Sequence, residues 1–302
     1  MLHKSRVCAD MGTENCPCRL AEYGKCLVCG RLDSEKGTCD CVWQGVCIYN
    51  EYMQNNCCIN GWQRDFRPYK IQKIKRYEKD LVVLQISVPR GVAEKAALPG
   101  SFVFVKAENS PQFFDVPLSV MKSDYEKGCI ELALKVDGPK TCELISRISD
   151  RLLMRGIYRN GLRGVGKLMS PEGKKVLCLT KGIGLAPVAN YIRWAGGKDR
   201  IDVIADLEKI SLPFAEAALD GCQIESVTYD RLPMEISWAA EERYDVIVIS
   251  ASDYFQENIF VPESKKVISN NHTMCCGEGI CGSCMCGDRD GVRHRMCKRS
   301  DL

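Results

Sequence analysis

The chain has 302 residues, of which 45% are hydrophobic, so it can bury the cores of more than one packed unit. Its formal net charge of +3 is nearly neutral, which argues against binding to nucleic acid or to an acidic membrane surface. No run approaches the roughly 20 apolar residues of a membrane-spanning helix, and we expect no membrane insertion.

Cysteine is the unusual residue, with 20 copies concentrated at the two ends of the chain. Ten lie in residues 1–58 and six in residues 275–297. A secreted disulfide scaffold is usually short and cross-linked throughout, and the N-terminus lacks the apolar segment of a signal peptide. We therefore expect reduced, metal-binding thiols in a cytoplasm, and in an anaerobe because exposed thiolates oxidise readily.

Residues 1–65 are rich in cysteine and glycine and contain too few apolar residues for a core of their own. We predict a metal-binding module, because a bound metal can stabilise such a segment. Its candidate ligands are closely spaced cysteines: Cys16, Cys18, Cys26, Cys29, Cys39, Cys41 and Cys47. Four of these would suffice for zinc or for a [4Fe–4S] cluster, and the spacing leaves both open.

Residues 66–170 have the period of short strands separated by polar turns. Phe102 and Phe104, for example, alternate with Val103 and Val105 after Pro99-Gly100. This pattern predicts an antiparallel β-barrel, and the segment TCELISRI predicts a short helix beside it.

Residues 171–262 change to short apolar strands that alternate with helical segments. KKVLCLT, IDVIADL and DVIVISA are strands of the kind buried on both faces of a parallel sheet. The alternation predicts a parallel α/β domain. Residues 263–302 then form a second cysteine-rich segment.

This last segment contains the pattern C-x4-C-x2-C-x12-C. The first two spacings are those of plant-type [2Fe–2S] proteins, in which one loop supplies three thiolates and a separate strand supplies the fourth. Structural zinc sites instead pair their ligands at two separated places, so we favour iron–sulfur over zinc. The predicted ligands are Cys276, Cys281, Cys284 and Cys297.

Three motifs precede this segment. Val116-Pro117-Leu118-Ser119-Val120 lies in a predicted strand, and Lys135-Val136-Asp137-Gly138-Pro139-Lys140-Thr141 forms a turn before a predicted helix. Gly182-Ile183-Gly184 opens the helix after KKVLCLT. Alone, each motif fits an ordinary strand or turn. Together, over residues 66–302, they resemble the electron-transfer subunits of dihydroorotate dehydrogenase B and the sulfide dehydrogenase-like small subunits of the ferredoxin–NADP reductase superfamily.

The resemblance implies FAD on the barrel, a nicotinamide nucleotide on the α/β domain and a nearby [2Fe–2S] cluster. It places the hydroxyl of Ser119 opposite flavin N5 and the turn at Thr141 against the FAD diphosphate, at a helix N-terminus that favours anions. The implied cofactor-binding residues are Val116, Pro117, Leu118, Ser119, Val120, Lys135, Val136, Gly138, Lys140, Thr141, Gly182 and Gly184.

The chain departs from the family pattern at three positions. Val116 stands where the flavin motif usually has arginine. Members of the sulfide dehydrogenase-like branch also have an apolar residue at that position. Lys181 replaces a glycine before the nucleotide turn, and Ser250-Ala251-Ser252 replaces a C-G-P loop. The last two departures affect one site, and they predict weak NAD(P) binding.

The sequence thus predicts an iron–sulfur flavoprotein subunit that moves electrons between FAD and a [2Fe–2S] cluster and on to a partner redox protein, with NAD(P)H as a candidate donor or acceptor. We find no general acid or base for an organic substrate, so a catalytic partner subunit is expected. The alternative is a non-enzymatic redox-sensing or binding module, stabilised by metal, on a degenerate reductase fold.

Overall fold

The computed structural model describes residues 64–111, 115–169, 173–232, 242–278, 281–287 and 293–299. These residues belong to two compact units. One runs from Phe66 to Asn271, and the other contains the described residues from His272 to Arg299 together with Arg64 and Asp65. The predicted N-terminal ligands lie outside the described residues: Cys16, Cys18, Cys26, Cys29, Cys39, Cys41 and Cys47.

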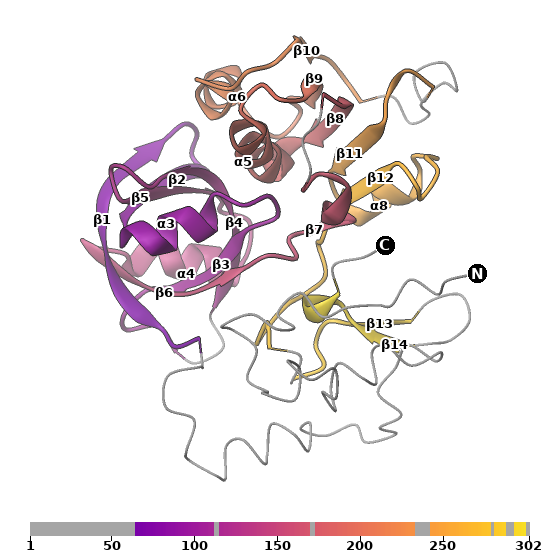
Figure 1. The fold of residues 1–302 in the computed structure, drawn as a ribbon. Helices are drawn as coiled ribbons and strands as arrows, with labels where there is room; N and C mark the ends of the chain where they lie inside the picture. The colour runs from indigo at the N-terminus through magenta and orange to yellow at the C-terminus, as the bar shows by residue number, and fades with distance from the viewer. Residues whose placement is uncertain are drawn as a thin grey trace. The chain divides into compact units, whose positions relative to one another are not determined.

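The first part of the larger unit is a closed antiparallel barrel with strand order β1-β2-β5-β4-β3-β6 (Figure 1). On β3, Val103 and Val105 pack in the barrel core, whereas Phe102 and Phe104 form an aromatic cluster with Tyr158 on the outer face. The strands are β1 (Arg67–Arg76), β2 (Leu81–Ser87), β3 (Phe102–Lys106), β4 (Val116–Asp124), β5 (Cys129–Lys135) and β6 (Arg151–Tyr158), and the helices are α3 (Arg90–Ala96) and α4 (Pro139–Arg147).

The second part is a sheet with strand order β10-β9-β8-β11-β12-β7, in which only β7 is antiparallel to its neighbour. Both faces are buried, since Val176 and Cys178 belong to one apolar cluster and Leu177 and Leu179 to another. The strands are β7 (Leu162–Arg163), β8 (Lys175–Lys181), β9 (Arg200–Asp206), β10 (Ser226–Tyr229), β11 (Val246–Ser250) and β12 (Lys266–Ser269). The helices are η2 (Val165–Lys167), η3 (Gly182–Gly184), α5 (Leu185–Ala195), α6 (Leu212–Leu219) and α8 (Asp253–Glu257).

Helix α5 joins the two parts of this unit. The buried amide of Asn190 donates hydrogen bonds to the carbonyl oxygens of Ala96 and Leu98, at 3.2 and 3.1 Å. One turn later, Arg193 donates to the carbonyl oxygen of Met121 in β4, at 3.0 Å, and to that of Ala218 in α6, at 2.6 Å. The barrel and the parallel sheet are therefore connected by polar contacts as well as by apolar packing.

These elements confirm the predicted antiparallel barrel followed by a parallel α/β sheet.

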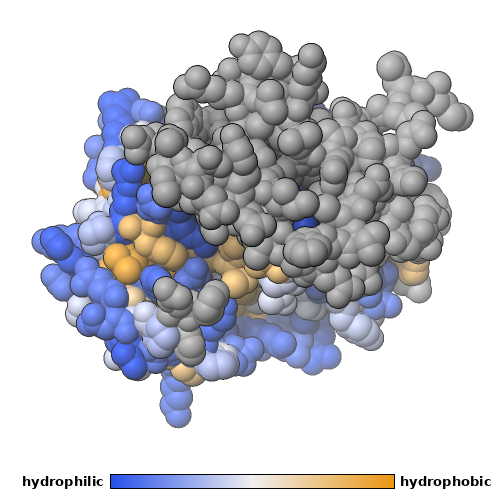
Figure 2. Space-filling view, turned by 90° about the horizontal axis from the view of Figure 1, so that it is seen from below, coloured by the Kyte–Doolittle hydropathy of each residue, from blue (hydrophilic) through white to orange (hydrophobic). Residues whose placement is uncertain are grey.

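In the part of the chain that the structure describes, no helix is both long and apolar enough to cross a bilayer. The coloured surface in Figure 2 is mostly hydrophilic, with apolar residues gathered in a limited area.

The smaller unit contains a hairpin of β13 (Met285–Gly287) and β14 (Arg293–Arg295), followed by η4 (Met296–Lys298). The hairpin pairs Met285 with Arg295, and the N–H of Met296 donates to the carbonyl oxygen of Cys284 at 3.2 Å. This pairing brings the end of the chain back beside the loop that carries the first three cysteines.

We predict that Gly184→Ala destabilises the larger unit. A Cβ atom at Gly184 would lie 2.1 Å from the carbonyl oxygen of Ser250, so α5 would have to move away from β11. Overpacking of this kind costs about 1–3 kcal/mol. Gly91→Ala, in α3, is the control, because its Cβ would meet no atom within 4 Å and alanine favours a helix. Thermal unfolding measures both variants, and equal midpoints would contradict the prediction.

Candidate functional site

The predicted flavin-binding strand forms the first half of β4, and its side chains alternate between two environments. Val116, Leu118 and Val120 pack in the barrel core. Pro117 is exposed and Ser119 is half-buried, so these two side chains are the ones that β4 presents outside the core. Ser119 pairs with Phe102 of β3, which sets its hydroxyl next to the outer aromatic cluster.

The predicted diphosphate turn leads into α4, with Gly138 at the position before the first helical residue. The hydroxyl of Thr141 accepts hydrogen bonds from the N–H groups of Asp137 and Gly138, at 3.0 and 3.1 Å, and thereby fixes the turn. A Cβ atom at Gly138 would meet nothing within 4 Å, and its φ of −153° suits any residue. The helix N-terminus therefore offers open space where an anion is favoured.

Lys135 and Val136, also predicted to bind the cofactor, have protein partners. The ammonium of Lys135 lies 3.0 Å from a carboxylate oxygen of Asp80 and donates to the carbonyl oxygen of Lys209 at 2.8 Å. The N–H of Val136 donates to the carbonyl oxygen of Asp80 at 2.6 Å. In the structure these two residues thus fasten β5 to the turn after β1.

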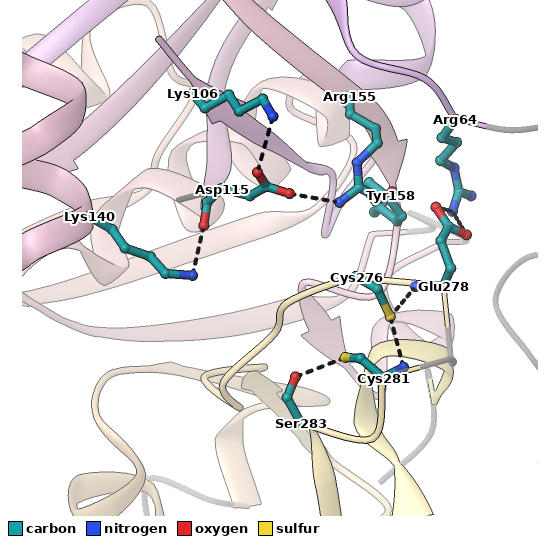
Figure 3. Close-up of polar contacts among 10 residues, drawn as sticks. All are labelled: Arg64, Lys106, Asp115, Lys140, Arg155, Tyr158, Cys276, Glu278, Cys281 and Ser283. Carbon is teal, nitrogen blue, oxygen red and sulfur yellow. Dashed lines mark hydrogen bonds and ion pairs between the residues drawn. The ribbon is translucent and has the colours of Figure 1, made fainter. Parts of the chain in front are cut away.

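Asp115 lies immediately before β4, and its carboxylate and backbone carbonyl oxygen contact three cationic side chains from separate elements (Figure 3). Lys106 Nζ lies 3.9 Å from its Oδ1, and the guanidinium of Arg155 donates to its Oδ2 at 3.4 Å. Lys140, in the first turn of α4, donates to its backbone carbonyl oxygen at 3.3 Å. Lys140 therefore connects the two predicted flavin motifs.

Arg155 is a buried arginine on the outer face of β6. Its guanidinium carbon lies 4.7 Å from the ring centre of Phe104 and 5.0 Å from that of Phe66, and it hydrogen-bonds to the hydroxyl of Tyr158. Such stacking and hydrogen bonding offset the cost of burying a cation. Sequence reasoning missed Asp115 and Arg155, although an arginine inside the apolar run LLMRGIY was a visible signal.

The two glycines of the predicted nucleotide turn lie in η3, after β8. Gly182 has a φ of +60°, which favours glycine, and a Cβ there would lie 3.4 Å from the side chain of Lys209. Gly184 is needed for its close approach to Ser250 of β11. The chain's own backbone thus accounts for the glycine at position 184.

The carboxyl ends of β8 and β11 lie where the strand order of the parallel sheet reverses, the usual place for a ligand in such sheets. Thr180 and Ser250 pair across these strands. Both hydroxyl groups are buried, and within the described residues neither has a hydrogen-bond partner.

Lys181 is the last residue of β8, and it pairs with Asp206 of the neighbouring strand β9. Its ammonium lies 2.6 Å from a carboxylate oxygen of Asp206 and also contacts the carboxylate of Glu208. Burial alone would lower the pKa of Lys181, but its hydrogen bonds to both carboxylates outweigh this effect and raise the pKa. The cation at position 181 is therefore held by two carboxylates at the carboxyl end of β8.

The four C-terminal cysteines belong to the smaller unit. The N–H groups of Glu278 and Cys281 donate to Cys276 Sγ, at 3.3 and 3.4 Å, and the N–H of Cys297 donates to Cys284 Sγ at 3.4 Å. The thiol of Cys297 lies within hydrogen-bond reach of both Cys276 and Cys284. Gly277 and Gly282 have φ values of 70° and 72°, which permit the tight loop.

The protonation of these thiols reflects their proximity. The hydrogen bond from the thiol of Cys297 lowers the pKa of Cys284 to about 7. The pKa of Cys297 is raised because its proton is shared with Cys276 and Cys284. Cys281 is exposed, and its sulfur lies 3.2 Å from the hydroxyl oxygen of Ser283 (Figure 3).

The donor set matches the chemistry of an iron–sulfur cluster, because thiolates supported by backbone N–H groups are its usual ligands. No three Cys, His, Asp or Glu side chains of the described ranges converge as a site for a single metal ion. A two-iron cluster differs from a single-ion site, because its ligands are divided between two metal atoms. Within the same loop, Glu278 forms ion pairs with Arg64 at 3.2 Å and with Lys298 at 3.4 Å.

No protein-family model matches the chain. Its fold is that of the ferredoxin reductase-type proteins. A chain of an NADH-dependent reduced ferredoxin–NADP oxidoreductase, studied for flavin-based electron bifurcation, matches 78% of this chain and 87% of its own length, with a TM-score of 0.54 and 19% identity. Phthalate dioxygenase reductase, a modular protein for electron transfer from pyridine nucleotides to [2Fe–2S], matches 78% of this chain and 96% of its own, with a TM-score of 0.50 and 14% identity.

Among proteins compared by sequence, the chain is similar to a probable dihydroorotate dehydrogenase B (NAD(+)) electron transfer subunit from Thermococcus kodakarensis. The two are 27% identical over 208 residues, which cover 64% of this chain and 82% of the relative. An uncharacterised protein of the adh 3′ region in Clostridium beijerinckii is 22% identical over 241 residues, covering 72% of this chain and 78% of its own. The expected resemblance to the electron-transfer subunits of dihydroorotate dehydrogenase B is confirmed.

We predict that Cys281→Ser and Cys284→Ser each abolish iron binding at the C-terminus, because serine replaces a soft thiolate with a hard, protonated hydroxyl. Cys286→Ser is the control, since that thiol lies in β13 and faces the carbonyl oxygen of Gly287. Iron content and the EPR signal of the reduced protein measure the outcome. Loss of the signal in Cys286→Ser, with retention in Cys297→Ser, would contradict the ligand assignment.

Proposed function

We propose that this protein is the electron-transfer subunit of a larger oxidoreductase, with FAD on the barrel and a [2Fe–2S] cluster at the C-terminal cysteines. The proposal is carried by one observation: the N-terminus of α4 lies next to the start of β4. There, Lys140 of α4 contacts Asp115, so the open helix N-terminus and the strand that carries Ser119 are held together. On a ferredoxin reductase fold, this arrangement suits a flavin dinucleotide.

Each part of the barrel site has a distinct task in this proposal. The open backbone at Gly138 and the N-terminus of α4 bind the diphosphate. The hydroxyl of Ser119, outside the barrel core, orients the flavin ring through a hydrogen bond at N5. The rings of Phe102 and Tyr158 stack with their centres 5.1 Å apart, and they form a rigid surface beside the flavin ring.

The C-terminal cysteines bind the cluster through their thiolates, and the N–H groups of Glu278, Cys281 and Cys297 stabilise the negative charge on sulfur. When bound, FAD exchanges electrons in pairs or singly and a [2Fe–2S] cluster accepts them one at a time. A catalytic or electron-accepting partner subunit completes the proposal, in line with the relative named as an electron transfer subunit.

The N-terminal cysteines extend the proposal to a second metal site, with zinc or an iron–sulfur cluster as the occupant. Its seven candidate ligands lie outside the described residues. Metal analysis of the full chain after removal of the C-terminal ligands would identify the metal.

We expect the purified chain to contain FAD and iron, with flavin and cluster bands in its visible spectrum. Gly138→Val should lose most of its FAD, because the added side chain extends into the open space before α4 while the backbone geometry tolerates it. The iron content should stay unchanged, because the predicted cluster ligands belong to the other unit. A wild-type spectrum with cluster bands and no flavin would instead support the redox-sensing alternative.

We also expect the isolated chain to react slowly with NADH and NADPH. Hydride transfer requires nicotinamide C4 to come within about 3–3.5 Å of flavin N5. Lys181, held by Asp206 and Glu208, lies across the edge through which the nucleotide would approach. Lys181→Ala should raise the rate of flavin reduction by about tenfold or more. A tenfold change corresponds to an activation free energy lower by about 1.4 kcal/mol. Stopped-flow mixing tests this, and reduction of the wild type within milliseconds at micromolar NADH would contradict it.

A further inference from the structure

Lys106 is a largely buried cation whose charge is poorly matched within the described residues. Its side chain is 15% exposed, and its ion pair with Asp115 is 3.9 Å long, well beyond a charge-assisted hydrogen bond. Its ammonium also lies 4.4 Å from the ring centre of Phe66. Desolvating an ammonium without close compensation is unfavourable, so an anion at this place would stabilise it.

Asp115, the ion-pair partner of Lys106 among the described residues, also binds a second cation. Asp115 is 13% exposed, and its Oδ2 accepts a hydrogen bond from Arg155, while its Oδ1 has no hydrogen-bond partner among the described residues. Lys140 contacts only the uncharged backbone oxygen of Asp115 in the interactions that the structure shows. Lys106 and Lys140 thus supply two positive charges, the magnitude needed to balance a diphosphate diester.

Strand register places this charge at the start of β4. Val105 pairs with Val116, so the next residue of β3, Lys106, lies beside Asp115. Val116 itself packs in the barrel core, and its side chain offers no charge. Lys140 adds its ammonium from the first turn of α4, whose N-terminus and open Gly138 backbone also attract an anion.

We propose that Lys106 and Lys140 bind the diphosphate of the flavin dinucleotide, and that Lys106 supplies from β3 the positive charge that the strand motif lacks at Val116. Asp115, held by Arg155, is a positioning residue: its carboxylate orients Lys106, and its backbone carbonyl oxygen contacts Lys140 of α4. This inference rests on the proposed flavoprotein function. It adds the ligand preference of the flavin site, which binds a flavin dinucleotide more tightly than a flavin without phosphate.

The test compares three ligands on the full-length chain after removal of its flavin. Dissociation constants are measured for FAD and riboflavin by flavin fluorescence, and for ADP by calorimetry, because riboflavin lacks the diphosphate and ADP lacks the flavin. The variants are Lys106→Met, Lys140→Met and the charge-retaining Lys106→Arg. Lys175→Met is the matched control, because Lys175 is 28% exposed, pairs with Asp202 at 4.0 Å and lies 5.4 Å from the ring centre of Tyr244.

We expect each methionine variant at Lys106 and Lys140 to weaken FAD and ADP binding about tenfold or more, with riboflavin binding unchanged within about twofold. Lys106→Arg should keep most of the FAD affinity, and Lys175→Met should match the wild type. Equal weakening of FAD and riboflavin, or no weakening of FAD, would overturn the inference. A wild type that binds neither flavin would refute the proposed function. In that case, ADP binding that Lys106→Met abolishes would still support the diphosphate site, and absence of ADP binding would overturn it.

Discussion

The attachment of α5 to the barrel is the contact on which the larger unit depends. Asn190 is almost fully buried, and it donates to the carbonyl oxygens of Ala96, the last residue of α3, and of Leu98 in the segment that follows. Loss of this amide would remove both hydrogen bonds, although the carbonyl oxygen of Leu98 would keep the one that it accepts from the N–H of Ser101. Through α5, the nucleotide turn at Gly182 is held in a fixed relation to β4, where Ser119 lies. Two sheets of different topology are therefore held in one compact unit.

The fold followed from the sequence because its period changes clearly. The apolar runs of β3 and β8 are each buried on both faces, and such short apolar runs between turn residues are typical of strands in a core. The short strands β7 and β12 were not predicted, because two and four residues are too few to show a period. Their place in the sheet is set by tertiary pairing with neighbours.

The candidate site was less accessible to sequence reasoning, because it depends on which face a residue occupies. Val116 and Ser119 belong to one motif, yet the first packs in the core and the second lies outside it. Lys106 and Asp115 are distant from Arg155 in the sequence and meet only when β3, β4 and β6 are side by side. The glycine at position 184 matched a nucleotide motif, whereas its close contact in the fold is with Ser250.

The buried thiol of Cys178 in the middle of β8 shows how the fold sorts its cysteines. Burial, with a smaller effect of the Asp202 charge, raises the pKa of Cys178 strongly, whereas the pKa of Cys284 is lowered. Metals and oxidants react with the thiolate, so a thiol that stays protonated competes poorly for either. Cys178 therefore behaves as a small apolar residue of the sheet core, protected from metals and oxidants by its burial.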